Sequence, residues 1–100
     1  MDEMKEKVFE IKVERIFLIQ KNGGIKAFAD IVLNDSIVIK GLKVLEDRTQ
    51  ALFVSMPSEK AKDGKWYETV RCLNQSLRQQ ITDTVLQAYS EQRGLKVASV

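Results

Sequence analysis

The sequence predicts an α+β fold, in which an antiparallel β-meander of about five strands is followed by one C-terminal α-helix packed on the sheet. Apolar and polar residues alternate over several short segments that end in turn-forming residues, as is typical of half-buried strands. The segment 76–92 instead repeats its apolar residues every three or four positions, which indicates an amphipathic helix. A chain of 100 residues with 44% hydrophobic and 30% charged residues is typical of one soluble domain.

The first two strands are expected at residues 8–19 and 26–33. Phe9, Ile11 and Val13 alternate with charged residues, so they are expected on one face of the first strand. In the second strand the residues expected on one face are Ala27, Ala29, Ile31 and Leu33. The Gly-containing segment 20–24 between the two strands favours a hairpin turn, because glycine readily adopts positive φ.

Three further strands are expected at residues 37–45, 51–56 and 65–71. A turn at Asn34-Asp35-Ser36 precedes the third strand, whose β-branched residues favour the extended conformation. Residues 46–50 form a polar connection, and Pro57 ends the fourth strand because it has no N–H to donate. The segment 58–64 then reads as a charged loop, with a turn at Asp63-Gly64.

The helix has the clearest pattern. Its apolar stripe comprises Leu77, Ile81, Val85, Ala88 and Tyr89. Ser76 and Gln79 have the spacing of a capping box, Asn74 is an alternative cap, and Gly94 is a plausible C-cap. We therefore expect a flexible N-terminus at 1–7, a single domain at 8–93 and a short tail at 94–100.

Composition argues against several functions. The net charge is only +2 and histidine is absent, so the commonest general base and metal ligand are missing. The single cysteine, Cys72, has no histidine to activate it and is expected to be a buried or half-buried structural residue. The sequence thus predicts no enzyme, catalytic residue, metal, cofactor, small-molecule substrate or membrane contact, and a reducing, cytoplasmic location.

Positive residues gather where the charged loop meets the helix. The candidate nucleic-acid-binding residues are Lys60, Lys62, Lys65, Arg71, Arg78 and Arg93. Lysines near a helix N-terminus favour phosphate binding, and the adjacent Trp66 and Tyr67 offer rings for base stacking. The competing interpretation is that the lysines are merely solvated and that Trp66 belongs to the core; Glu59 and Asp63 also dilute the charge of the loop.

The sequence also contains more apolar surface than one small sheet and helix would cover. Leu86 lies off the helical stripe, and two strands carry apolar residues on both faces, at 16–19 and at 37–39. A homodimer that joins sheets or packs helices would bury this surface. An irregular monomeric core is the alternative.

Three stretches together resemble the SpoVG family, the stage V sporulation protein G septation regulators of bacteria. They are KAFADIVLNDSIVIKGLKVLE, ALFVSMPSEKAKDGKWYETV and LNQSLRQQITDTVLQAY, and the likeness covers roughly residues 10–89. Its most specific part is LFVSMPS followed by a basic loop with Asp-Gly. The resemblance implies a cytoplasmic homodimer that binds DNA, and also RNA, and regulates gene expression, sporulation or septation.

Some basic positions agree with this resemblance and others depart from it. Lys60 and Arg78 stand at basic positions of the family, in the loop and at the helix start. Glu59, Lys62 and Gln80 depart from the residues common in relatives, so the target sequence and affinity are left open. The alternative function is a protein-protein interaction module in cell-division control, in which the exposed loop contacts a protein.

Overall fold

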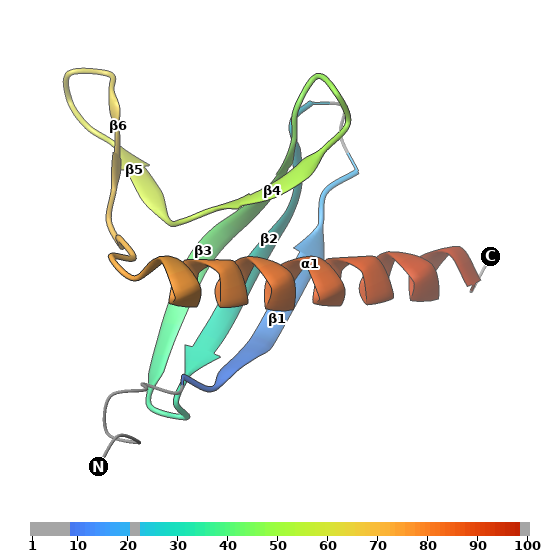
Figure 1. The fold of residues 1–100 in the computed structure, drawn as a ribbon. Helices are drawn as coiled ribbons and strands as arrows, with labels where there is room; N and C mark the ends of the chain where they lie inside the picture. The colour runs from blue at the N-terminus through green and yellow to red at the C-terminus, as the bar shows by residue number, and fades with distance from the viewer. Residues whose placement is uncertain (1–8, 21–22, 99–100) are drawn as a thin grey trace, which may run out of the picture.

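The computed structural model describes residues 9–20 and 23–98, and side-chain environments as far as residue 94. A four-stranded antiparallel sheet has the order β1-β2-β3-β4, and two shorter strands form a separate sheet (Figure 1). The elements are β1 (Ile11–Leu18), β2 (Ile25–Leu33), β3 (Ile37–Glu46), β4 (Leu52–Ser55), β5 (Ser58–Lys60), β6 (Trp66–Glu68) and α1 (Gln75–Ala98). The α+β fold and the meander followed by a helix are confirmed.

The core lies between the four-stranded sheet and α1, which crosses one face of the sheet (Figure 1). The buried apolar residues are Ala27, Ala29, Ile31, Leu42, Val44, Val54 and Met56 on the sheet side and Ile81, Val85 and Tyr89 on α1. α1 packs mainly over β1, and also contacts β4 and β3. This confirms three of the four residues predicted on the β2 face and most of the helical stripe, whereas Leu33 and Ala88 are only half-buried.

A β-bulge in β1 explains why this strand is apolar on both faces. Val13 pairs with Ile31 but Arg15 pairs with Asp30, so Glu14 is the extra residue. The alternation shifts at this point because a bulge puts two residues opposite one. Ile16 and Leu18 consequently pack against the core, whereas Phe17 lies on the face away from α1 and is 47% exposed.

A second bulge accommodates the buried carboxylate of Asp30. The pairing of β2 with β3 shifts between Ala29 and Ile31, opposite Gly41. Gly41 adopts a φ of +89°, and its N–H donates a hydrogen bond of 3.1 Å to Oδ1 of Asp30. A buried carboxylate needs such a partner, so the bulge and the acidic residue stabilise each other.

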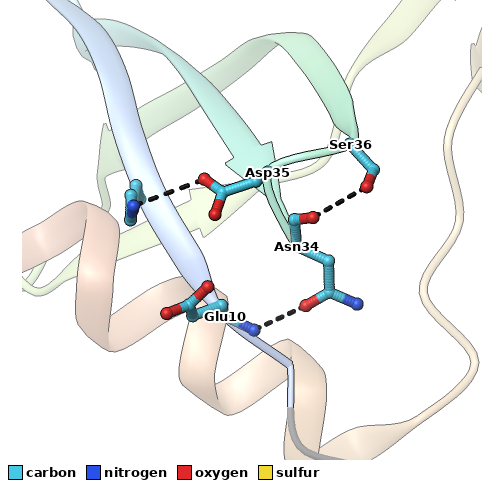
Figure 2. A network of polar contacts seen from close by, with 5 residues as sticks. Glu10, Asn34, Asp35 and Ser36 are labelled. Carbon is cyan, nitrogen blue, oxygen red and sulfur yellow. Dashed lines mark hydrogen bonds and ion pairs between the residues drawn. The ribbon is translucent and has the colours of Figure 1, made fainter.

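The turn at 34–36 is held by the polar network drawn in Figure 2. Asn34 and Asp35 have φ values of 53° and 52°, as in the mirror-image turns that suit β-hairpins. Asn34 Oδ1 accepts the N–H of Glu10 at 2.8 Å, and Asp35 forms a 3.3 Å ion pair with Lys12. The turn is thus tied to the start of β1 and has a structural role.

The fifth strand does not join the meander, which corrects that expectation. Residues 66–68 pair with 58–60 instead, so the predicted charged loop is itself a small hairpin. Met56 and Pro57 are buried where the chain leaves β4, and Pro57 cannot donate to the ladder. The Pro57 carbonyl accepts the N–H of Thr69 at 2.9 Å and closes the base of this hairpin. We call residues 58–68 the arm.

The helix starts and ends differently from the expected bounds. Asn74 Oδ1 accepts the N–H of Leu77 at 2.9 Å, so Asn74 is the cap rather than Ser76. α1 also continues through Gly94 to Ala98, and the predicted C-cap is wrong. Leu86 is half-buried against the core, and it therefore supplies less of the uncovered apolar surface than its place off the helical stripe suggested.

Removing the cap should weaken the helix without disturbing the sheet. We expect Asn74→Ala to lower the free energy of unfolding by about 1 kcal/mol, because one N–H of the first turn loses its partner. Urea denaturation followed by circular dichroism measures this change. Ser76→Ala is the control and should lower the free energy of unfolding by less than half as much. A larger loss for Ser76→Ala than for Asn74→Ala would assign the cap to Ser76.

Candidate nucleic-acid interface

The arm projects from the sheet at the end of the molecule where α1 begins (Figure 1). Ser58 pairs with Glu68 near its base, and Lys60 pairs with Trp66 near its far end. Lys62 and Lys65 lie in the turn that follows, and all three lysines are exposed. We call Lys60, Lys62 and Lys65 the lysine tip, since the hairpin brings them together at one end of the arm.

Asp63 organises the turn of the arm. Its Oδ1 accepts the N–H of Lys65 at 2.9 Å, and its Oδ2 accepts the Tyr67 hydroxyl at 2.7 Å. Gly64, with φ of +84°, donates its N–H to the carbonyl of Ala61 at 2.9 Å. The predicted Asp63-Gly64 turn is confirmed, and the carboxylate that dilutes the charge of the loop also holds the lysine tip in place.

These hydrogen bonds predict how the arm responds to pH. The Lys65 N–H, and next the Tyr67 hydroxyl, lower the pKa of Asp63 below its ordinary value of 3.8. The same carboxylate raises the pKa of Tyr67 above 10.0. A lowered carboxyl pKa stabilises the arm above pH 3.8, and this stabilisation is lost as pH falls through the lowered value. The Tyr67 contribution is present below pH 10.0 and is lost as pH rises through the raised value.

We expect the Lys65 amide resonance to titrate at a pH below 3.8 and the Tyr67 ring resonances above 10.0. Nuclear magnetic resonance spectra recorded across pH measure both transitions. Tyr67→Phe should raise the lower transition toward 3.8 because one hydrogen bond to Asp63 is removed. An unchanged lower transition in that variant would show that the hydroxyl does not act on the carboxylate.

Trp66 is not a core residue, which corrects the interpretation that competed with base stacking. Its side chain is 60% exposed, and Nζ of Lys43 lies 4.8 Å from the ring centroid. Such a cation-π contact fixes one side of the ring and leaves the rest accessible. No sequence pattern singles out Lys43, because its place beside the arm depends on how the strands pair.

The start of α1 forms the second candidate area. Gln75, Ser76, Arg78, Gln79 and Thr82 line an open concavity of about 510 Å³ on the first turns. No acidic residue occupies the first turn of α1, so the partial positive charge of the helix N-terminus is not neutralised there. The lysine tip does not line this concavity, and the proposed joint action of Lys60 and Arg78 stays a prediction.

The remaining candidates lie elsewhere. Arg71 is exposed on the connection between the arm and α1, whereas its neighbours Val70 and Cys72 pack against the core. Arg93 lies fifteen residues beyond Arg78, about 22 Å along the helix axis at 1.5 Å per residue. It lines a different concavity, of about 240 Å³, with Lys26 and Tyr89. Arg93 is therefore separate from the helix start.

Among the side chains of residues 9–20 and 23–94, two ion pairs are present, Lys12 with Asp35 and Lys26 with Glu46. Neither involves a candidate nucleic-acid-binding residue, so no described carboxylate forms an ion pair with the lysine tip or with Arg78. Gln80 donates a 2.7 Å hydrogen bond to the carbonyl of Phe9. In this chain Gln80 ties α1 to the residues before β1.

Other kinds of site have little support in the described residues. No group of three His, Cys, Asp or Glu side chains there is arranged to hold a metal ion. The Cys72 thiol donates to the carbonyl of Asn74 at 3.3 Å and is half-buried, as expected. α1 lacks the apolar length that a bilayer-crossing helix needs.

Comparison with known proteins identifies the family. The SpoVG family model matches residues 6–91. A protein of Archaeoglobus fulgidus called "Putative septation protein SpoVG" is 41% identical over 83 residues, which cover 83% of this chain and 96% of the relative. Proteins of the same name from Staphylococcus saprophyticus and Staphylococcus carnosus are 36% and 35% identical over 85% of this chain, and the matches cover 80% and 76% of those proteins. The expected resemblance is thereby confirmed, and the chain belongs to the SpoVG family.

Proposed function

We propose that this protein binds nucleic acid, DNA and also RNA, and regulates gene expression connected with septation or sporulation. The observation that carries the proposal is the lysine tip, three exposed cations at the end of a projecting, hydrogen-bonded arm. Lysines supply the sequence-independent part of nucleic-acid affinity by neutralising phosphates. The septation name of the relatives supports the cellular process.

The arm concentrates positive charge although the chain as a whole carries only +2. Successive residues of a strand point to opposite faces, so Glu59 lies on the other face of β5 from Lys60. Asp63 turns its carboxylate toward the Lys65 N–H and the Tyr67 hydroxyl. Glu68 shares the face of Lys60 but pairs with Ser58 near the base of the arm, so the far end presents the lysines away from it.

The start of α1 provides a second contact for the same polyanion. The chain from Thr69 to Asn74 links the arm to α1, and Arg71 is exposed on this link. Arg78 follows on the helix, beside a concavity wide enough for a phosphate group. Cations at the tip, link and helix start would together follow a nucleic-acid backbone, which carries regularly spaced charges.

Selection of bound fragments from random DNA and RNA pools at physiological salt tests the proposal. We expect enrichment of at least one class, with affinity that falls as salt rises. Lys60→Ala combined with Arg78→Ala should weaken binding while the fold is retained. The matched control is Lys12→Ala with Arg48→Ala, which removes the same charge outside the candidate area. Equal affinity of the two double variants would refute the site.

The alternative function, a protein-interaction module, predicts a different result. Leu73 is 86% exposed on the link between the arm and α1, and it offers an apolar contact for a protein. A single dominant protein captured from lysate after nuclease treatment, and lost in Leu73→Ser, would favour that function. The homodimer remains part of the proposal and is checked by sedimentation equilibrium.

A further inference from the structure

The face of the four-stranded sheet opposite α1 carries a row of aromatic and cationic side chains. Phe17 of β1 pairs with Phe28 of β2, and Phe28 pairs with Lys43 of β3. Lys43 in turn lies over the ring of Trp66, at 4.8 Å. Directly opposite residues on neighbouring strands have Cβ atoms about 5 Å apart, so the row runs across the sheet from β1 to the arm.

The rings of this row are accessible. Phe17 is 47% exposed, Trp66 is 60% exposed and Phe28 is half-buried between them. Phe53 of β4, which pairs with Leu45 on the same face, is 44% exposed. We call Phe17, Phe28, Phe53 and Trp66 the aromatic face.

The charges on this side of the sheet are mainly positive. Arg15, Lys40 and Lys43 lie around the aromatic face, and no carboxylate in the described part of the chain forms an ion pair with them. The exposed carboxylates nearest in the chain are Glu14, beside Arg15, and Glu68, two residues from Trp66. Asp30, opposite Arg15, is only 9% exposed and accepts the N–H of Gly41. A ligand that approaches the aromatic face therefore meets three cations.

This charge distribution decides between two occupants. A second copy placed face to face would put two sets of Arg15, Lys40 and Lys43 into one interface, and like charges oppose such contact. A single-stranded nucleic acid is complementary, because it offers both phosphates and unpaired bases. Aromatic side chains on an open antiparallel sheet are a known means of stacking such bases.

We propose that the aromatic face binds single-stranded nucleic acid, with bases stacked on Phe17, Phe28 and Trp66 and phosphates near Arg15, Lys40 and Lys43. This inference rests on the proposed function, to which it adds a second surface and a ligand form. The lysine tip lies beyond Trp66 on the arm, so the same strand can continue from the sheet to the arm.

The single tryptophan of the chain provides a direct probe. Addition of an oligothymidylate or an oligouridylate should quench Trp66 fluorescence in a saturable manner, because a stacked base contacts the ring. A DNA duplex of equal length has its bases already stacked and should quench much less. Comparison of the two oligonucleotides shows whether the strand is DNA or RNA. Absence of quenching by both would overturn the proposal.

Substitution of Phe17 tests the sheet itself. Phe17→Leu retains an apolar side chain but loses the aromatic ring, and it should weaken single-strand binding between about 5- and 150-fold. Val38→Ala is the control on the same side of the sheet, where Val38 is 44% exposed and has no ring. Equal affinity of Phe17→Leu and the parent would overturn the proposal, as would a homodimer that Phe17→Leu abolishes.

The two proposals fail in distinguishable ways. If the aromatic face alone is wrong, duplex binding persists and still depends on Lys60 and Arg78, while Phe17→Leu has no effect. If nucleic-acid binding as a whole is wrong, neither the duplex nor the single strands bind the parent protein. Unfolding of each variant by urea confirms that a loss of binding does not reflect a loss of fold.

Discussion

Replacement of Lys60, Lys62 and Lys65 together by glutamine is expected to reduce the salt dependence of duplex binding by about two to three units of the log–log slope. Each phosphate that a lysine neutralises releases about 0.9 counterion from duplex DNA, and the three lysines of the tip account for the change. The side chains are exposed, so the arm should remain folded. Fluorescence anisotropy of a labelled duplex between about 50 and 200 mM salt measures the slope.

Removal of a negative charge from the same arm provides the control. Glu59→Gln removes a negative charge next to Lys60 and should strengthen duplex binding modestly. An unchanged slope in the triple glutamine variant would mean that the lysine tip does not contact phosphate. Weaker binding of Glu59→Gln would show that the response of the arm is not electrostatic.

Leu42→Ala is expected to lower the free energy of unfolding by about 2–5 kcal/mol, as is typical when a buried leucine is truncated and leaves a cavity. Leu42 is fully buried between the sheet and α1. Small domains are stable by only about 5–15 kcal/mol, so this variant should lose a large part of its stability. Urea denaturation monitored by circular dichroism measures the loss.

Ile37→Ala is the matched control on the same strand. Ile37 is 56% exposed at the start of β3, so its truncation removes little buried surface and should cost less than about 1 kcal/mol. A loss below about 1 kcal/mol for Leu42→Ala would contradict the core described above, because a fully buried leucine rarely costs so little.

Short-range patterns account for the parts of the fold that the sequence predicted. The alternation of Ala27, Ala29 and Ile31 and the periodicity of Ile81, Val85 and Tyr89 are set by strand and helix geometry alone. The bulges at Glu14 and Gly41 depend on pairing with β2, which no local pattern reveals. The exposed position of Phe17 follows from the first bulge and was therefore not predictable.

The same distinction applies to the candidate site. The lysine tip was evident from the sequence because its residues are close along the chain. The partner of residues 66–68 was not, since no local pattern distinguishes pairing with β4 from the observed pairing with residues 58–60. The contact of Lys43 with Trp66 joins two strands of different sheets, and only the three-dimensional structure reveals it.

The most direct test is a titration of the isotope-labelled protein with a DNA duplex, followed by nuclear magnetic resonance. It shows whether the arm and the start of α1 bind the same polyanion. If they do, the amide signals of residues 60–65 and 75–78 shift together with a single dissociation constant, while those of Asp83 and Glu91, two acidic residues further along α1, stay unchanged. Shifts confined to one segment, or two segments that saturate at different duplex concentrations, would contradict this account.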